Sequence, residues 1–544
     1  MKRKLLTMIS LFVISALLLS GCGTFGGSST GGDQVLRLNN FEEPGSLHPQ
    51  KAQGTHDSWV LEHIFEGLTK KDVTGKVIPG MAEKWEISAD GLSYTFHLRN
   101  AKWSNGDTIT AQDFEYAWKF GLDPNTASDY SYQLYYLKGG EKYNTADPKK
   151  VSADELKKLA DAVGVKAVDA KTLQVTLEKP AAYFLELMSF YTYYPINKKV
   201  QESNPTWFNE ASSYVSNGAF KLTEWKHKEG LVISKNDGYY DKSKIKLKEI
   251  HFAVISDENT AWQMYQNGEL DQTYPLPQDV TAKLTAEKNP EFVVGDDLST
   301  YFYRFNTTKK PFTNVKVRKA LAMAIDRQSL VKNVAQGGQR PAYGITPPGI
   351  PDVKGDFALN TGAMYKEDLT EAKKLLAEGL KEEGMDKLSF TLTYNTNEGH
   401  KKIAEAIQEM WRKNLGIDVK LENVEFQVKI DREHKLDYAM TRAGWIGDYI
   451  DPMTFLDMWT TESTQNDTGW KNPEYDKLIH EAQNSMDQEL RMKNMRAAEK
   501  ILMEQMPIMP IYFYTHPYSL KPYVKDVFKP VNRYVQFHYA YIQK

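Results

Sequence analysis

The sequence predicts a mixed α/β fold with at least two lobes. Short strands with a period of two alternate with turns in the first third, and strand–helix–strand patterns follow after residue 299. Residues 94–99 show the first pattern, because Tyr94, Phe96 and Leu98 fall on one face of an extended strand. The length of 544 residues also exceeds what a single hydrophobic core normally holds.

The first third of the chain predicts strands and one helix. Residues 172–178 repeat the period of two, and the dipeptides at 90–91 and 105–106 are Asp-Gly and Asn-Gly turn signals. Residues 109–120 predict a helix, for which Thr110 is a suitable N-cap.

The rest of the chain adds strands and longer helices. Strand patterns continue through 215–275, and residues 258–271 predict a short helix. Residues 314–334 and 400–416 each place apolar side chains on one helical face, and Gly416 is a typical helix stop. Because apolar strands flank the second of these helices, α/β units are expected.

The N-terminus predicts export. Three basic residues precede 16 mostly apolar ones, too few to span a bilayer as a helix, and Leu19-Ser20-Gly21-Cys22 ends the run. This ending resembles the lipobox of bacterial lipoproteins. We therefore expect a signal peptide at 1–21, and a lipidated Cys22 followed by a Gly/Ser-rich flexible tether to residue 33. An ordinary signal peptide with a stray cysteine is the alternative.

Composition and motifs exclude several classes of function. Removal of the leader leaves 523 residues and takes the formal net charge from −3 to about −6, which argues against nucleic acid as a partner. The one cysteine permits no internal disulfide and no thiol metal cluster. The sequence has no G-x-S-x-G elbow, P-loop, dinucleotide fingerprint or H-E-x-x-H. These absences favour binding over catalysis, without a cofactor or metal.

The segment 441–459, "TRAGWIGDYIDPMTFLDMW", raises a question of charge. Arg442, Asp448 and Asp451 stand in a run that reads as half buried, where a charge needs a partner. Asp448 can form an internal salt bridge with Arg442 or a nearby lysine. Otherwise its cation arrives with a ligand.

A family resemblance covers essentially all of residues 34–544. The chain resembles the family 5 extracytoplasmic solute-binding proteins of peptide ABC importers and, more closely, their oligopeptide- and murein-tripeptide-binding members. The segments that carry the resemblance are 66–118, "DPNTAS" (123–128), "NGAFKLTEW" (217–225), 304–327, 392–416 and "RAGWIGDYIDPMTFLDM" (442–458).

The resemblance implies a periplasmic-binding-protein-like fold of type II, class C, with three lobes. Lobe I would comprise 34–65, 198–298 and 516–544, lobe II 66–197, and lobe III 299–515. Lobes I and III would close on a short peptide about a hinge. The protein would then be a monomeric lipoprotein on the outer face of the cell membrane, which delivers peptides to the permease subunits of an ABC transporter and performs no reaction.

The resemblance also implies the binding residues. Asp448 would pair with the α-ammonium of the peptide, by a charge-assisted bond. Arg442 would meet a ligand carboxylate, and His400 the C-terminus of longer peptides. A surface ion pair for Arg442 and a helix N-terminal position for His400 are the alternatives. The other expected peptide contacts are Gln53, Gly54, Thr55, Tyr130, Arg304, Asn395, Gly444, Trp445 and Ile446.

The chain departs from the oligopeptide-binding pattern at charged positions. Gln53 and Arg304 stand where close relatives carry glutamates, and Ala335 where a lysine can receive a C-terminus. We therefore expect better tolerance of peptides with Glu or Asp side chains, cell-wall peptides among them. Arg304 can instead pair with Asp296, Asp297 or another acidic group.

Three rival functions stay open at this point. The same fold can bind nickel chelates, sugars or heme, since a fold does not fix a function. A surface peptidase is the second rival. A receptor that imports peptides as signals is the third.

Overall fold

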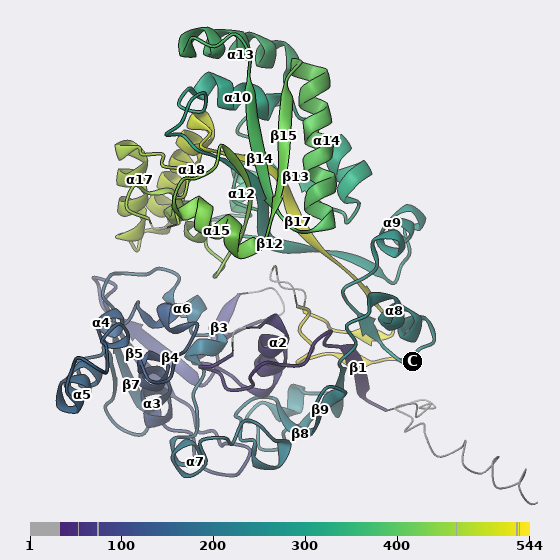
Figure 1. Cartoon of the computed structure of the whole chain (residues 1–544). Helices are drawn as coiled ribbons and strands as arrows, with labels where there is room; N and C mark the ends of the chain where they lie inside the picture. The colour runs from purple at the N-terminus through teal and green to yellow at the C-terminus, as the bar shows by residue number, and fades with distance from the viewer. Residues whose placement is uncertain (1–32, 53, 73–75, 464, 529–530, 532–533) are drawn as a thin grey trace, which may run out of the picture.

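The structure is a computed structural model that describes residues 33–52, 54–72, 76–463, 465–528, 531 and 534–544. The expected signal peptide (1–21), the lipidated Cys22 and Gln53 lie outside the described residues, as does all of the tether but its last residue. Figure 1 shows the chain folded into two bodies, an upper body built on one large sheet and a lower body built on two smaller sheets.

The first sheet of the lower body has the order β1-β10-β9-β8. Its first pair is parallel and the others are antiparallel. Its strands are β1 (Val35–Asn39), β8 (Phe220–Lys226), β9 (Gly230–Lys235) and β10 (Glu249–Ala253).

The second sheet of the lower body is antiparallel, in the order β4-β5-β7-β6, and a ribbon of β2 and β3 lies outside it. The strands are β2 (Thr69–Lys71), β3 (Val77–Pro79), β4 (Ala82–Ile87), β5 (Ser93–Leu98), β6 (Val165–Ala167) and β7 (Thr172–Thr176). The helices of the first 290 residues are α2 (Thr55–Ile64), α3 (Ala111–Leu122), α4 (Gly140–Asn144), α5 (Ala153–Asp161), α6 (Phe184–Leu187), α7 (Lys198–Ser203), α8 (Glu258–Gln266) and α9 (Gln278–Glu287), with 3₁₀ turns at Ser131–Leu134, Tyr191–Tyr193, Ala211–Ser213 and Lys242–Lys244.

The upper body contains a mixed seven-stranded sheet in the order β11-β17-β12-β16-β14-β15, with β13 beside β17. Its strands are β11 (Gln272–Thr273), β12 (Phe292–Phe305), β13 (Arg340–Pro341), β14 (Ser389–Asn395), β15 (Asp418–Val424), β16 (Met440–Ile446) and β17 (Ile508–Leu520). Only the pairs that β14 makes with β15 and β16 are parallel.

Helices cover this sheet (Figure 1). They are α10 (Val315–Met323), α11 (Arg327–Leu330), a π turn (Val331–Ala335), α12 (Phe357–Thr361), α13 (Leu369–Glu383), α14 (Glu398–Leu415), α15 (Phe426–His434), α16 (Met453–Leu456), a 3₁₀ turn (Asp457–Trp459), α17 (Pro473–Gln483) and α18 (Gln488–Gln505). The chain ends in a small ribbon of β18 (Val524–Lys525) and β19 (Tyr541–Ile542).

Two long strands connect the bodies. β12 and β17 have 14 and 13 residues and pair along most of their length, and in Figure 1 both run from the upper body toward the lower one. Their register shifts between Asp296 and Thr300. Before the shift, Phe292–Asp296 pair with β17, and after it Ser299–Phe305 pair also with β16 and enter the centre of the large sheet.

Local sequence signals locate most of these elements. The helix expected at 109–120 is α3, with Thr110 and Asp113 forming a capping box. The helix expected at 400–416 is α14, which ends at Gly416 with a left-handed φ of 68°. The single helix expected at 314–334 is wrong, because Asp326 caps a second helix by accepting a bond from the Ser329 N–H.

Candidate functional site

A cleft lies between the bodies, with a cavity volume of about 340 Å³. The lower body contributes the start of α2 and an aromatic wall, and the upper body contributes the residues that follow β16. Among the residues that line it are Gly54, Thr55, Tyr130, Tyr191, Leu298, Ile446, Gly447 and Asp448.

Asp448 carries a charge without an internal partner. Its backbone N–H donates to Thr454 Oγ1 at 3.1 Å, but its carboxylate makes no ion pair with any residue that the structure describes. The side chain is exposed to the cleft, yet the protein walls around it remove enough water to raise its pKa to about 6. The internal salt bridge to Arg442, which the sequence left open, does not form in the described structure.

The third charge of the segment is satisfied internally. Asp451 is buried and binds Arg491 through both oxygens, at 2.9 and 3.0 Å. This bidentate pair holds the chain turn that follows Asp448 against α18.

Arg442 carries the opposite charge in the same segment, on strand β16. Its guanidinium donates to Tyr514 Oη at 2.8 Å and to Asn395 Oδ1 at 3.4 Å, and lies 4.7 Å from the ring centre of Tyr301. Its Nε is buried without a hydrogen-bond partner, and no carboxylate of the described residues pairs with it. His400 lies nearby. Burial of its ring lowers its pKa to about 3, and the positive charges of Arg442 and Lys429 add to this effect. His400 is therefore neutral at physiological pH.

Strand β16 offers an open edge beside these charges. On one side it pairs with β12 along its whole length, from Met440 to Ile446. On the other side β14 pairs only with Met440 and Thr441. Gly444, Trp445 and Ile446 therefore lie on a strand edge that no other described strand covers.

Arg304 lies away from the cleft. It is buried, and its Nη1 binds Glu433 at 3.1 Å and Asp467 at 2.8 Å. The acidic partners are thus not Asp296 or Asp297; Asp296 binds Arg340 instead.

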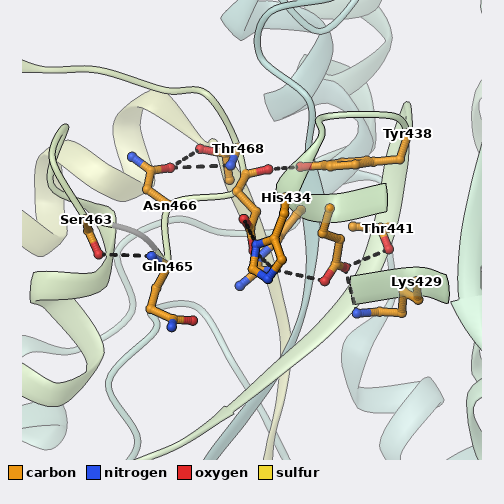
Figure 2. A network of polar contacts seen from close by, with 11 residues as sticks. Lys429, His434, Tyr438, Thr441, Ser463, Gln465, Asn466 and Thr468 are labelled. Atoms are coloured by element: carbon orange, nitrogen blue, oxygen red, sulfur yellow. Dashed lines mark hydrogen bonds and ion pairs between the residues drawn. The ribbon is translucent and has the colours of Figure 1, made fainter. Parts of the chain in front are cut away.

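A polar network surrounds the two ion pairs of Arg304. Figure 2 shows Lys429 and Thr441 directed at one carboxylate, that of Glu433, at 2.7 and 2.9 Å. His434 contacts the other, that of Asp467, at 2.9 Å. The charge of Arg304 is therefore balanced inside the upper body. Arg304 thus gives no support to the expected tolerance of peptides with Glu or Asp side chains.

Two features near the site have no signal in the sequence. Tyr183 and Tyr449 stack between the bodies, and Asp457 lines a hollow together with Asp448. Both depend on contacts between distant parts of the chain, which local patterns do not reveal. The short segment "FLDMW" around Asp457 shows only an acidic residue in an apolar run.

Within the described residues, no group of three or more His, Cys, Asp and Glu side chains is arranged to hold a metal ion. None of the described helices is both long and apolar enough to cross a membrane.

A two-body α/β fold with a ligand-sized cleft and an unpaired carboxylate on its wall is typical of a solute-binding protein. The chain belongs to the bacterial extracellular solute-binding proteins of family 5, whose middle region matches residues 76–467.

Known relatives agree with this family. The chain is 45% identical to the oligopeptide-binding protein OppA of Bacillus subtilis, over 99% of this chain and 100% of the relative. Among solved structures it is similar to the murein tripeptide-binding protein MppA in its unliganded open form, with a TM-score of 0.82 and 35% identity over 94% of this chain and 97% of that one. The Haemophilus influenzae OppA complex with the peptide RPPGFSPFR gives a TM-score of 0.71 and 35% identity, over 95% of this chain and 100% of that one. These relatives are binding proteins for peptides.

Proposed function

We propose that this protein is the substrate-binding component of an ABC importer, which captures short peptides between two lobes and delivers them to the permease. The observation that carries the proposal is the wall formed by β16. Asp448, two residues after this strand, presents an unpaired carboxylate to the cleft, and Gly444 and Ile446 lie on an open strand edge. Arg442, on the same strand, has no carboxylate partner among the described residues.

This wall is complementary to the constant parts of a peptide. The α-ammonium pairs with Asp448 through a charge-assisted hydrogen bond, and a carboxylate can pair with Arg442. The backbone adds to β16 at Gly444 and Ile446 as an extra strand. Side chains vary among peptides, but the ends and the backbone do not, so a carrier of mixed peptides benefits from binding those.

The opposite wall completes the binding site. Gly54, Thr55 and Tyr130 face Asp448 across the cleft, and closure would bring them onto the ligand. Asn395 positions the Arg442 guanidinium, and Trp445 lies in the wall beside Asp448. His400, which is neutral here, can serve as a hydrogen-bond partner for a C-terminus.

We assign the lobes as the sequence predicted them: 34–65, 198–298 and 516–544 in lobe I, 66–197 in lobe II, and 299–515 in lobe III. The three larger sheets support this division: lobe I contains the sheet β1-β10-β9-β8, lobe II the sheet β4-β5-β7-β6, and lobe III most of the seven-stranded sheet. The register shift in β12 supports a hinge at Asp296–Thr300. The higher TM-score to an unliganded open form supports an open state here, in which Asp448 awaits its ligand.

The N-terminal signals support a lipid-anchored protein on the outer face of the membrane. Lipidation of Cys22 would hold the folded body there by a flexible tether, within reach of the permease. The protein would act as a monomer and would catalyse no reaction.

Native mass spectrometry of the purified protein tests the proposal. Trapped ligands should add masses of short peptides, and unfolding should release them uncleaved. A sugar, a metal chelate or heme as the trapped ligand would refute peptide capture, and cleaved peptide products would indicate a peptidase instead.

A further inference from the structure

A hollow adjoins the cleft, and Asp448 lines both spaces. The upper body provides most of the wall of the hollow, and Tyr132 and Lys179 close it from the lower body. Its polar lining includes Asp457, Thr460, Glu462, Ser463, Gln465 and His480. A ligand whose α-ammonium binds Asp448 therefore has this hollow next to its first residue.

Asp457 is the acidic residue of this region that lacks a counter-ion. Asp451 is paired with Arg491, and Glu462 is paired with His480. Asp457 forms no ion pair with any residue within the described ranges. Burial raises its pKa to about 7, and the carboxylates of Asp448 and Asp451 contribute to the rise, while the N–H groups of Met458 and Asp457 itself oppose it.

The cations that line the hollow are engaged elsewhere. His480 binds Glu462, and Lys179 lowers the pKa of that same carboxyl. Neither cation forms an ion pair with Asp457 or Asp448 within the described residues. The hollow is therefore lined by two carboxylates, those of Asp448 and Asp457, with which no described cation pairs.

A second unsatisfied group points to an occupant. The Nε1 of Trp445 is buried without a hydrogen-bond partner, and Trp445 lines the same hollow. A buried donor left unpaired costs free energy unless something satisfies it. The hollow is thus lined by an unpaired carboxylate and by a residue with an unpaired donor, beside the group that binds the peptide end.

We propose that this hollow is a subsite for a cationic side chain on the first residue of the peptide, with Asp457 as its counter-ion. The inference rests on the proposed function, because Asp448 must place the α-ammonium before the side chain can reach Asp457. A lysine or arginine side chain is long enough to extend from the peptide backbone while its charged end remains hydrated. Peptides with a basic first residue are the ligand class that it selects.

The tripeptides Lys-Ala-Ala and norleucine-Ala-Ala provide the test, because norleucine has the lysine stem without its ammonium. Calorimetry at about pH 8, where Asp457 is ionised, should show the parent protein binding the lysine peptide about tenfold more tightly. Asp457→Asn should reduce this preference below about twofold and leave the norleucine peptide unchanged.

Glu462→Gln is the matched control, because Glu462 lines the same hollow but already has a cation. It should keep the preference for lysine. Equal affinity of the parent protein for the two peptides would overturn the subsite without any variant, while leaving peptide binding intact. Tighter binding of Glu-Ala-Ala than of Lys-Ala-Ala would also overturn it, and would assign the hollow to Lys179 and His480. If the parent protein binds none of these peptides, the proposed function fails and the subsite fails with it.

Discussion

Tyr183 and Tyr449 stack face to face across the two bodies, with ring centres 4.1 Å apart and planes inclined by 10°. Tyr183 directly precedes α6 in the lower body, and Tyr449 follows Asp448 in the upper body. The guanidinium of Arg491, which binds Asp451, lies 5.9 Å from the ring centre of Tyr183. The chain that follows Asp448 is thus held by contacts between residues far apart in the sequence.

Loss of the tyrosine stack should destabilise the protein. Tyr183→Leu keeps an apolar side chain but removes the ring, so we expect the free energy of unfolding to fall by about 1 kcal/mol. Urea denaturation measures the change. Leu359→Ala is the control, because Leu359 is 71% exposed and should change the stability by less than about 0.5 kcal/mol. An unchanged midpoint for Tyr183→Leu would show that the stack contributes nothing.

Peptide affinity should depend on pH through Asp448. The pKa of its carboxyl is about 6 in the free protein, and only the ionised form attracts an ammonium group. Affinity should be constant just above pH 6 and fall by about tenfold per pH unit below it. A second decline is expected above about pH 8, where the α-amino group of the peptide loses its proton.

Calorimetry across this range measures the profile. Asp448→Asn should bind peptide weakly, and this residual affinity should not fall below pH 6. This result would distinguish Asp448 from other titrating groups near the cleft, such as Glu62. If the affinity of this variant still falls below pH 6, another residue is responsible for the titration.

Removal of Arg304 should destabilise the upper body. Arg304→Met leaves the buried carboxylates of Glu433 and Asp467 with less positive charge, at a cost of about 3 kcal/mol. Urea denaturation measures this cost. Arg412→Ala breaks the exposed pair with Glu409 and should cost less than about 1 kcal/mol, so equal effects of the two changes would contradict the buried network.

The same variant tests the preference for acidic peptides that the sequence suggested. Because Arg304 is neutralised internally, Arg304→Met should leave the ratio of affinities for Ala-Glu-Lys and Ala-Lys-Lys unchanged. A shift toward the basic peptide would mean that Arg304 reaches the ligand after closure.

The sequence predicted the parts of the fold that depend on local order. The capping box at Thr110 and the left-handed Gly416 act within a few residues, so the ends of α3 and α14 follow from the sequence. The break after α10 was missed, because the apolar pattern continues through the cap at Asp326.

The partners of the charged side chains were harder to predict than the helices and strands. The sequence singled out Asp448, since an acidic residue in an apolar run needs a cation. It did not identify Glu433 and Asp467 as the partners of Arg304, because the three residues meet only when β12 and α15 pack together with the loop after α16. For the same reason, Asp457 could not be distinguished from the paired Asp451.

The most direct test of the account compares Ala-Ala-Ala with its N-acetylated form, in the parent protein and in Asp448→Asn. Calorimetry should show that the parent protein binds the free peptide tightly and the acetylated peptide poorly. Asp448→Asn should lose about 2–5 kcal/mol for the free peptide and should no longer distinguish the two. Tight binding of the acetylated peptide by the parent protein, or full affinity for the free peptide in Asp448→Asn, would contradict the claim that Asp448 receives the peptide's ammonium group.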